Sequence, residues 1–241
     1  MTAQQLANLG VYDAKTIKIY PRLILSLCGL EKQGKTHFGL TAPGDIMYFN
    51  LDNRMEGVID KFSQEKTISV VDISFSDNQD KAIEEWDKYM TVYNLALADP
   101  KIRTIIVDTA TELWELLRFA RFGRSSNVSF LYAPLNAEFA KMIRQPSKNT
   151  NVIFLHKMKP VYLNDKRTGD YERAGFGNMG FTVQVNAQIW RDEEGDRDFH
   201  CYIKDSGQNS DAAGEDLVGP LCNFPMLATT ILPDTDPSYW E

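Results

Sequence analysis

Residues 29–36 of this chain have the types and spacing of a loop that binds phosphate. They read Gly29, Leu30, Glu31, Lys32, Gln33, Gly34, Lys35 and Thr36. The two glycines let the backbone curl close to phosphate oxygens without a side-chain clash. We expect Lys35 to reach the β- and γ-phosphates as a catalytic residue, and the Thr36 hydroxyl to hold Mg²⁺.

The residues around the loop have the context that this motif requires. The apolar run at 23–28 predicts a buried strand that leads into the loop. Residues 36–40 predict the start of a helix, which should end before Pro43 and Gly44. The expected cofactors are therefore ATP and Mg²⁺, with the nucleotide contacting residues from Gly29 through His37.

Composition and charge narrow the class of protein. The chain has 241 residues, of which 43% are hydrophobic, and a net charge of −7. No apolar stretch approaches the roughly 20 residues that span a bilayer, and no secretory signal begins the chain. We therefore expect a cytoplasmic protein with no membrane partner. The charge argues against a polybasic nucleic-acid coat but is compatible with a local basic groove.

Three cysteines stand far apart in the chain. Cys28, Cys201 and Cys222 lack the spacing of metal ligands. We expect them to be buried, reduced thiols, as is usual for widely spaced cysteines in a cytosolic protein.

Apolar runs alternate with amphipathic segments between residues 22 and 155. Strands are expected at 16–20, 45–51, 67–73, 102–107 and 152–155, and a late hairpin at 183–190 and 199–204. Helices are expected at 55–62, 83–97, 109–122 and around 135–143. This alternation predicts an α/β fold. Its sheet should be mostly parallel, with helices on both faces and an antiparallel hairpin at one edge.

Three polar residues end predicted strands, where ligands bind in sheets of this kind. Asp108 is expected to hold Mg²⁺ with Thr36, the alternative being a helix cap. Asp52 can orient or deprotonate the water that attacks the γ-phosphate, although a turn residue explains it equally well. Glu56 is a weaker candidate for that role. His156 can sense the γ-phosphate, the alternative being a histidine whose ring bonds to backbone.

Residues 157–173 combine positive charges with aromatic rings. They are followed by a glycine-rich stretch at 175–181, which we expect to be mobile. Cations can contact the phosphates of single-stranded DNA while aromatic rings stack on its bases. The candidates are Lys157, Lys159, Tyr162, Lys166, Arg167, Arg173 and Phe176. A solvated hairpin with its turn at 165–169 is an equally good interpretation.

Taken together, these motifs resemble the RecA-like P-loop NTPase core, and most of all the short phage-encoded RecA-like single-strand annealing proteins. The resemblance rests on residues 29–36, on the strands that end in Asp52 and Asp108, and on the strand at 152–155 with its basic, glycine-containing continuation. It implies an ATPase domain over residues 15–205, with Asp52 as its catalytic carboxylate. Residues 1–14 are then a peripheral segment, and residues 206–241 a tail that wraps the surface.

The resemblance also implies a function and partners. The function is DNA-dependent ATP hydrolysis in homologous recombination or strand annealing, in the cytosol of a bacterial or phage-infected cell. The implied partners are single-stranded DNA, further copies of the chain with nucleotide near the subunit interfaces, and a single-strand binding protein. Two positions depart from the family: His156 stands where glutamine is usual, and Lys204 alone represents a lysine-rich segment.

Three other classes of nucleotide-binding protein stay open. A small-molecule or nucleoside kinase would need lid arginines, for which Arg118, Arg121 and Arg124 are candidates that a solvated helix explains as well. A GTPase switch is disfavoured, because the chain lacks a base-reading Asn/Thr-Lys-x-Asp segment and a glycine three residues after Asp108. The third alternative is an interaction protein that holds a structural nucleotide.

Overall fold

A single large sheet forms the centre of the computed structural model, which describes residues 3–11, 13, 15, 21–52, 55, 57–125, 132–146 and 149–241. The strand expected at 16–20 lies outside these residues, as does Glu56. The strands of the sheet are β1 (Ile24–Cys28), β2 (Asp45–Asn50), β3 (Ile68–Asp72), β4 (Ile102–Asp108), β5 (Asn151–His156), β8 (Val185–Arg191), β9 (Phe199–Ser206) and β10 (Asp216–Val218). Their order is β10-β9-β8-β1-β5-β4-β2-β3.

The strands from β8 to β3 in this order are all parallel, whereas β9 and β10 are antiparallel to their neighbours. The prediction of an α/β fold with a mostly parallel sheet and an antiparallel edge is therefore confirmed. Because the parallel strands all run the same way, their carboxyl ends meet at one edge of the sheet. That edge carries the loops that follow β1, β2, β4 and β5.

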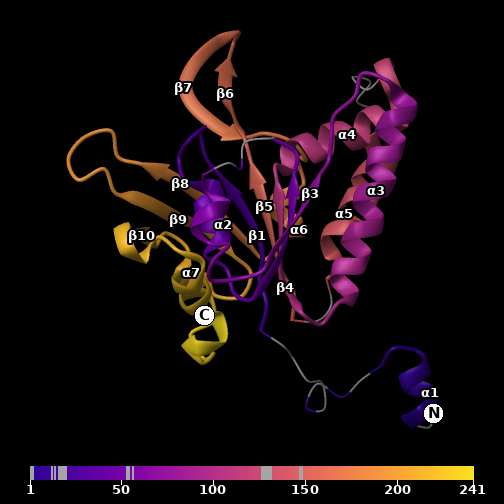
Figure 1. Cartoon of the computed structure of the whole chain (residues 1–241), viewed down its shortest axis with the longest axis horizontal. Coiled ribbons are helices and arrows are strands. Elements are labelled where there is room, and N and C mark those ends of the chain that lie inside the picture. Colours follow the sequence, from indigo (N-terminus) through magenta and orange to yellow (C-terminus); the bar gives the residue numbers. More distant parts are fainter. Residues whose placement is uncertain are drawn as a thin grey trace.

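Helices cover both faces of the sheet (Figure 1). On one face, α3 (Gln79–Ala98), α4 (Ala110–Phe122) and α5 (Tyr132–Arg144) pack on a core that includes Phe49, Val107 and Phe154. On the other face, α2 (Lys35–Leu40) and α7 (Phe224–Ile231) pack on Leu25 and Leu155. None of the helices in the described part of the chain has the length and apolarity that crossing a membrane requires.

Local sequence explains where these helices begin and end. Asn78 caps α3 by accepting a hydrogen bond from the Lys81 N–H at 3.1 Å. Thr109 caps α4 in the same way, accepting from the Glu112 N–H at 3.3 Å, as its capping-box pattern predicts. Of the helix expected at 55–62, the described residues form only a short 3-10 turn at Ile59–Lys61.

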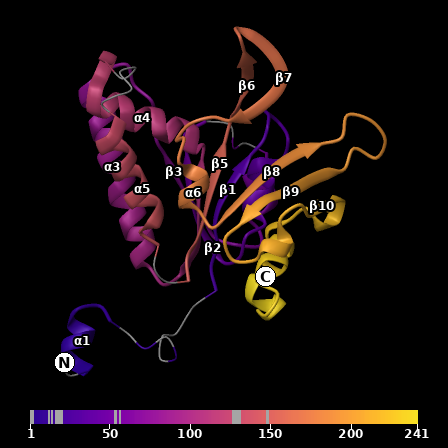
Figure 2. The ribbon, with the colours of Figure 1, turned by 180° about the vertical axis from the view of Figure 1, so that it is seen from behind.

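The basic segment forms a hairpin of its own, β6 (Met158–Leu163) with β7 (Lys166–Arg173). Figure 2 shows this hairpin projecting beyond the sheet. Its turn is at Asn164 and Asp165, which adopt left-handed φ values of 50° and 60°, and not at 165–169. The glycine-rich stretch at 175–181 leads into the short helix α6 (Met179–Thr182), in which Met179 is fully buried.

The two ends of the chain differ in how they relate to the core. The N-terminal α1 (Ala3–Asn8) lies away from the sheet (Figure 1). Residues 206–241 were expected to wrap the surface, and this expectation is wrong. They supply β10 and α7, and they bury Trp240, whose indole N–H donates to the Thr235 hydroxyl at 2.8 Å. Apolar side chains from this segment complete the core on the α2 face.

Replacing Trp240 by alanine should lower the free energy of unfolding by about 3–5 kcal/mol, because the change leaves a large cavity under α7. Urea unfolding followed by circular dichroism would measure the loss. Phe181→Ala is the control, since Phe181 is 90% exposed and its removal should change stability by less than about 0.5 kcal/mol. An equally small effect at Trp240 would contradict the assignment of the C-terminal segment to the core.

Candidate nucleotide-binding site

Four strand ends converge on one cavity at the carboxyl edge of the sheet. The cavity has a volume of about 400 Å³ and is lined by residues 31–37 together with Asp52, Asp108 and Lys157. In the sheet register, Asn50 of β2 lies opposite Asp108 of β4. The parallel register therefore brings together side chains that are far apart in the sequence.

The two glycines of the loop are required by their neighbours as well as by any phosphate. Gly34 has a left-handed φ of 86°, and a Cβ atom there would lie 2.8 Å from the ring of Phe199. A Cβ atom on Gly29 would lie 2.6 Å from the carbonyl oxygen of Ile189. Residues of β8 and β9 thus pack so closely against the loop that only glycine fits at these two positions.

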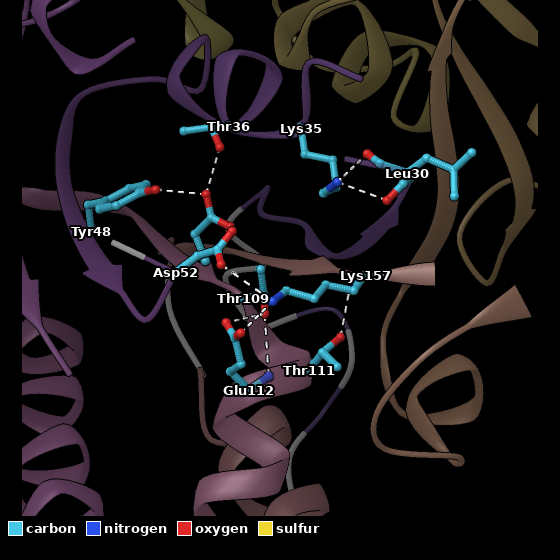
Figure 3. A network of polar contacts seen from close by, with 11 residues as sticks. Leu30, Lys35, Thr36, Tyr48, Asp52, Thr109, Thr111, Glu112 and Lys157 are labelled. Atoms are coloured by element: carbon cyan, nitrogen blue, oxygen red, sulfur yellow. Dashed lines mark hydrogen bonds and ion pairs between the residues drawn. The ribbon is translucent and has the colours of Figure 1, made fainter. Parts of the chain in front are cut away.

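Lys35 turns its side chain back onto the loop (Figure 3). Its ammonium donates to the carbonyl oxygens of Gly29 at 2.8 Å and Leu30 at 2.6 Å. Burial lowers the pKa of Lys35, while the negative charges of Asp108 and Asp52 oppose this change. The ammonium is therefore held at the wall of the cavity by groups that a phosphate can replace.

Asp108 is buried, and one of its carboxylate oxygens accepts hydrogen bonds from two hydroxyl groups. Its Oδ2 accepts from the Thr36 hydroxyl at 2.6 Å and from the Tyr48 hydroxyl at 2.7 Å (Figure 3). The expected pair of Thr36 and Asp108 is thus brought together. Sequence reasoning missed Tyr48. Its signal was a tyrosine within the apolar strand β2, because a buried tyrosine hydroxyl usually has a hydrogen-bond partner.

Burial raises the pKa of Asp108, and the nearby charge of Asp52 adds to this, while the hydrogen bonds from Thr36 and Tyr48 act in the opposite direction. A cation beside this carboxylate would favour its charged form. Hydroxyl and carboxylate oxygens are the ligands that Mg²⁺ prefers, so the residues present fit this ion. Within the described residues, no group of three or more acidic, His or Cys side chains can hold a metal. Phosphate and water would therefore have to complete the coordination.

The structure places Lys157 in this cavity, away from the exposed positive charges of the hairpin with which it was grouped. Its ammonium lies 3.3 Å from Asp52 Oδ1 and also contacts Glu112 Oε1. Burial alone would lower the pKa of Lys157, but the Glu112 and Asp52 carboxylates raise it overall. The candidate catalytic carboxylate Asp52 therefore forms an ion pair within the site.

His156 is not part of the cavity. Its side chain is fully buried, and neither ring nitrogen has a hydrogen-bond partner among the described residues. Burial, together with the charge of Arg173, lowers the pKa of His156 to about 3. The ring is therefore neutral, and it lies where it cannot touch a nucleotide in this structure. The cavity residue from this strand end is the next one, Lys157.

Four of the residues expected to contact DNA are exposed on the hairpin. They are Lys159, Tyr162, Lys166 and Arg167. Tyr162 is 62% exposed. The Arg167 guanidinium lies 5.1 Å from the centre of the Tyr171 ring, and Lys159 pairs with Glu172 at 3.1 Å.

The other two expected DNA contacts point into the protein. Arg173 donates to Asn186 Oδ1 at 3.1 Å and to the Ser26 hydroxyl at 3.3 Å. Phe176 is 1% exposed, and its ring centre lies 5.2 Å from that of Trp114 and 5.1 Å from that of Phe139. The expectation that Phe176 stacks on bases is therefore wrong for this conformation, because the ring belongs to the core.

Two of the three arginines considered for a kinase lid pair with glutamate side chains. Arg118 pairs with Glu115 and Arg121 with Glu138, each at 2.6 Å. Arg121, whose side chain is 34% exposed, fits the solvated-helix interpretation. The Arg118 side chain is only 14% exposed, and its guanidinium also contacts the Tyr132 side chain. Arg124 is exposed. Lys204 is exposed on β9.

The cysteines are free thiols, as expected. Cys28 and Cys201 are buried as expected, whereas the expectation is wrong for Cys222, which is partly exposed. Cys222 lines a second, mostly apolar cavity of about 320 Å³ that adjoins the first. The two cavities share Gly34, His37, Val58 and Phe199. Charged side chains, among them Lys35 and Asp108, line the first cavity, whereas mainly apolar side chains line the second. This combination suits a ligand with a charged end and an aromatic end.

Comparison with known proteins gives no family for this chain. No family model matches it, and no curated protein matches it. The function is accordingly inferred from the geometry of the site.

Replacing Asp108 by asparagine should stabilise the nucleotide-free protein at neutral pH. The asparagine oxygen can still accept from Thr36 and Tyr48, and the buried charge is gone. Because burial raises the folded-state pKa of Asp108 above its unfolded value, the wild type loses stability as the pH rises through the folded pKa. The melting temperature of the variant relative to wild type should therefore increase between about pH 4.5 and pH 7.5.

Asp234→Asn provides the control, since Asp234 is exposed. Thermal unfolding of this control should follow the wild type at both pH values. A lower melting temperature for the Asp108 variant than for wild type at pH 7.5 would contradict the cost assigned to its buried charge.

Proposed function

We propose that this chain is a RecA-like P-loop ATPase that acts on single-stranded DNA in homologous recombination or strand annealing. The observation that supports nucleotide binding is the contact between Thr36 and Asp108 beside the glycine loop and Lys35. These side chains lie at the carboxyl edge of a mostly parallel sheet, where such sheets bind ligands. The cavity there, with its apolar neighbour, offers enough room for a nucleotide.

Each residue then has a distinct role. Lys35 exchanges the carbonyl oxygens of its own loop for the β- and γ-phosphates of ATP. Thr36 and Asp108 would hold Mg²⁺, which would supply positive charge to the phosphates. Asp52 orients the attacking water, and the apolar cavity between His37 and Phe199 receives the base.

The hairpin of β6 and β7 supports the assignment of single-stranded DNA as the partner. It exposes Tyr162 together with Lys159, Lys166 and Arg167, which combines stacking with phosphate contacts. Asp165, Asp170 and Glu172 on the same hairpin offset these positive charges. Base stacking is therefore expected to contribute more than phosphate contacts.

The proposal includes the partners that the family resemblance implies. Further copies of the chain would assemble with nucleotide near their interfaces, and a single-strand binding protein would act on the same DNA. Light scattering with and without ATP would test the assembly.

A second candidate function is an interaction protein that holds ATP without hydrolysing it. The ion pair between Asp52 and Lys157 favours this alternative, because a carboxylate held by a cation is a weaker base. Tight ATP binding with no turnover would select it over the ATPase.

ATP hydrolysis should be stimulated by single-stranded DNA and should be lost in Lys35→Ala. The lysine supplies charge to the phosphates in the transition state, so its removal should reduce turnover by at least about 100-fold. Phosphate release, measured with and without an oligonucleotide, gives both results. Turnover that DNA does not change would contradict the DNA-dependent part of the proposal.

Binding of single-stranded DNA should weaken only moderately as salt rises. With three exposed cations on the hairpin, the slope of log affinity against log salt should be no steeper than about −2.

Tyr162→Ala should weaken binding by about 1–3 kcal/mol through the loss of one stacked base. Fluorescence anisotropy of a labelled oligonucleotide would measure both quantities. Phe75→Ala is the control, because Phe75 is also an exposed aromatic residue but lies outside the hairpin, with its ring against Phe119 of α4. Equal losses in the two variants would contradict the hairpin as the DNA site.

A further inference from the structure

Lys157 is a positive charge enclosed by negative charges inside a cavity that is built for an anion. It follows β5 directly, and its ammonium contacts both Asp52 and Glu112 (Figure 3). Its side chain is 32% exposed and lines the cavity. The ion pairs are therefore open to competition from a ligand that enters there.

The two lysines of the site are held by different kinds of group. Lys35 is bound by neutral carbonyl oxygens, whereas Lys157 is bound by two carboxylates. A neutral carbonyl gives way to any phosphate group, including those of a diphosphate. Two carboxylates should give way only to a stronger anion at that position. A terminal phosphate, with up to two negative charges and three acceptor oxygens, is such an anion.

Glu112 can release the ammonium without loss of local structure. Its other carboxylate oxygen accepts a hydrogen bond from the Thr109 hydroxyl at 3.1 Å, and its N–H donates to the same hydroxyl. These bonds belong to the cap of α4 and do not involve Lys157. The ammonium can therefore move while the cap stays formed.

We infer that Lys157 is a γ-phosphate-binding residue, which moves from Glu112 and Asp52 to the terminal phosphate when a nucleoside triphosphate binds. It returns to the carboxylates when that phosphate is lost. This inference rests on the proposed nucleotide site, and it assigns to Lys157 the role that the sequence suggested for His156. Asp52 then loses this counter-ion only while a triphosphate is present, so its basicity rises when water is to be activated.

Equilibrium binding of ADP and of a non-hydrolysable ATP analogue tests the inference without any catalytic readout. Isothermal calorimetry in the presence of Mg²⁺ gives both affinities. In Lys157→Met, the affinity for the ATP analogue should fall by about five- to tenfold, as expected for one lost charge-assisted contact that is partly exposed. The affinity for ADP should be unchanged.

Glu112→Gln should have the opposite effect. Glutamine can keep the cap of α4, since the capping box accepts either residue. It removes one competing charge, so the affinity for the ATP analogue should rise by about threefold while that for ADP is unchanged. Lys88→Met is the matched control, because Lys88 forms an exposed ion pair with Glu85 on α3 at 3.4 Å. Its affinities should equal those of the wild type.

The outcomes separate this inference from the proposed function. Equal losses for ADP and the ATP analogue in Lys157→Met would overturn the inference, as would no loss for either. If the wild-type protein binds both ligands and Lys35→Ala does not, the nucleotide site stands in either case. If the wild type binds neither ligand, the proposed function fails, and the role of Lys157 fails with it.

Discussion

The candidate site depends on a buried carboxylate at the end of β4. Asp108 carries its charge to the carboxyl edge of the sheet, and one of its oxygens holds hydroxyls from α2 and β2. Those two hydrogen bonds join the helix that follows the glycine loop to the strand that leads to Asp52. Burial of this carboxylate is unfavourable in the nucleotide-free protein and would become favourable beside a cation. Such groups are characteristic of functional sites, where binding chemistry is retained at some cost in stability.

A second network connects the cavity to the hairpin. The Lys157 N–H donates to the Thr111 hydroxyl at 3.0 Å, and that hydroxyl donates to the Ala174 carbonyl at 3.2 Å. The Ala174 N–H in turn donates to the Lys157 carbonyl at 2.9 Å. The two ends of the hairpin are thus tied to the first turn of α4 and to each other. The backbone of Lys157 therefore connects the proposed nucleotide site to the base of the hairpin that exposes Tyr162.

The antiparallel edge of the sheet also shapes the site. Ile189 and Phe199 lie against Gly29 and Gly34, so β8 and β9 fix the loop before any ligand binds. The C-terminal segment supports this edge by adding β10 beside β9 and α7 below it. Residues late in the chain thus hold in place a motif near its beginning.

The sequence by itself determined the parts of this protein that depend on local pattern. Apolar runs, helix caps and the spacing of the glycine loop identified the parallel strands, α3 and α4, because each signal lies within a few residues. The Thr36–Asp108 pair followed from the rule that strand ends of a parallel sheet meet at one edge. Tertiary structure decided which side chains of neighbouring positions enter the cavity. Successive residues of a strand point to opposite faces, so a difference of one position buries His156 and leaves Lys157 in the site. It also decided that Phe176 is a core residue, because the rings of Trp114 and Phe139 that pack against it lie far away along the chain.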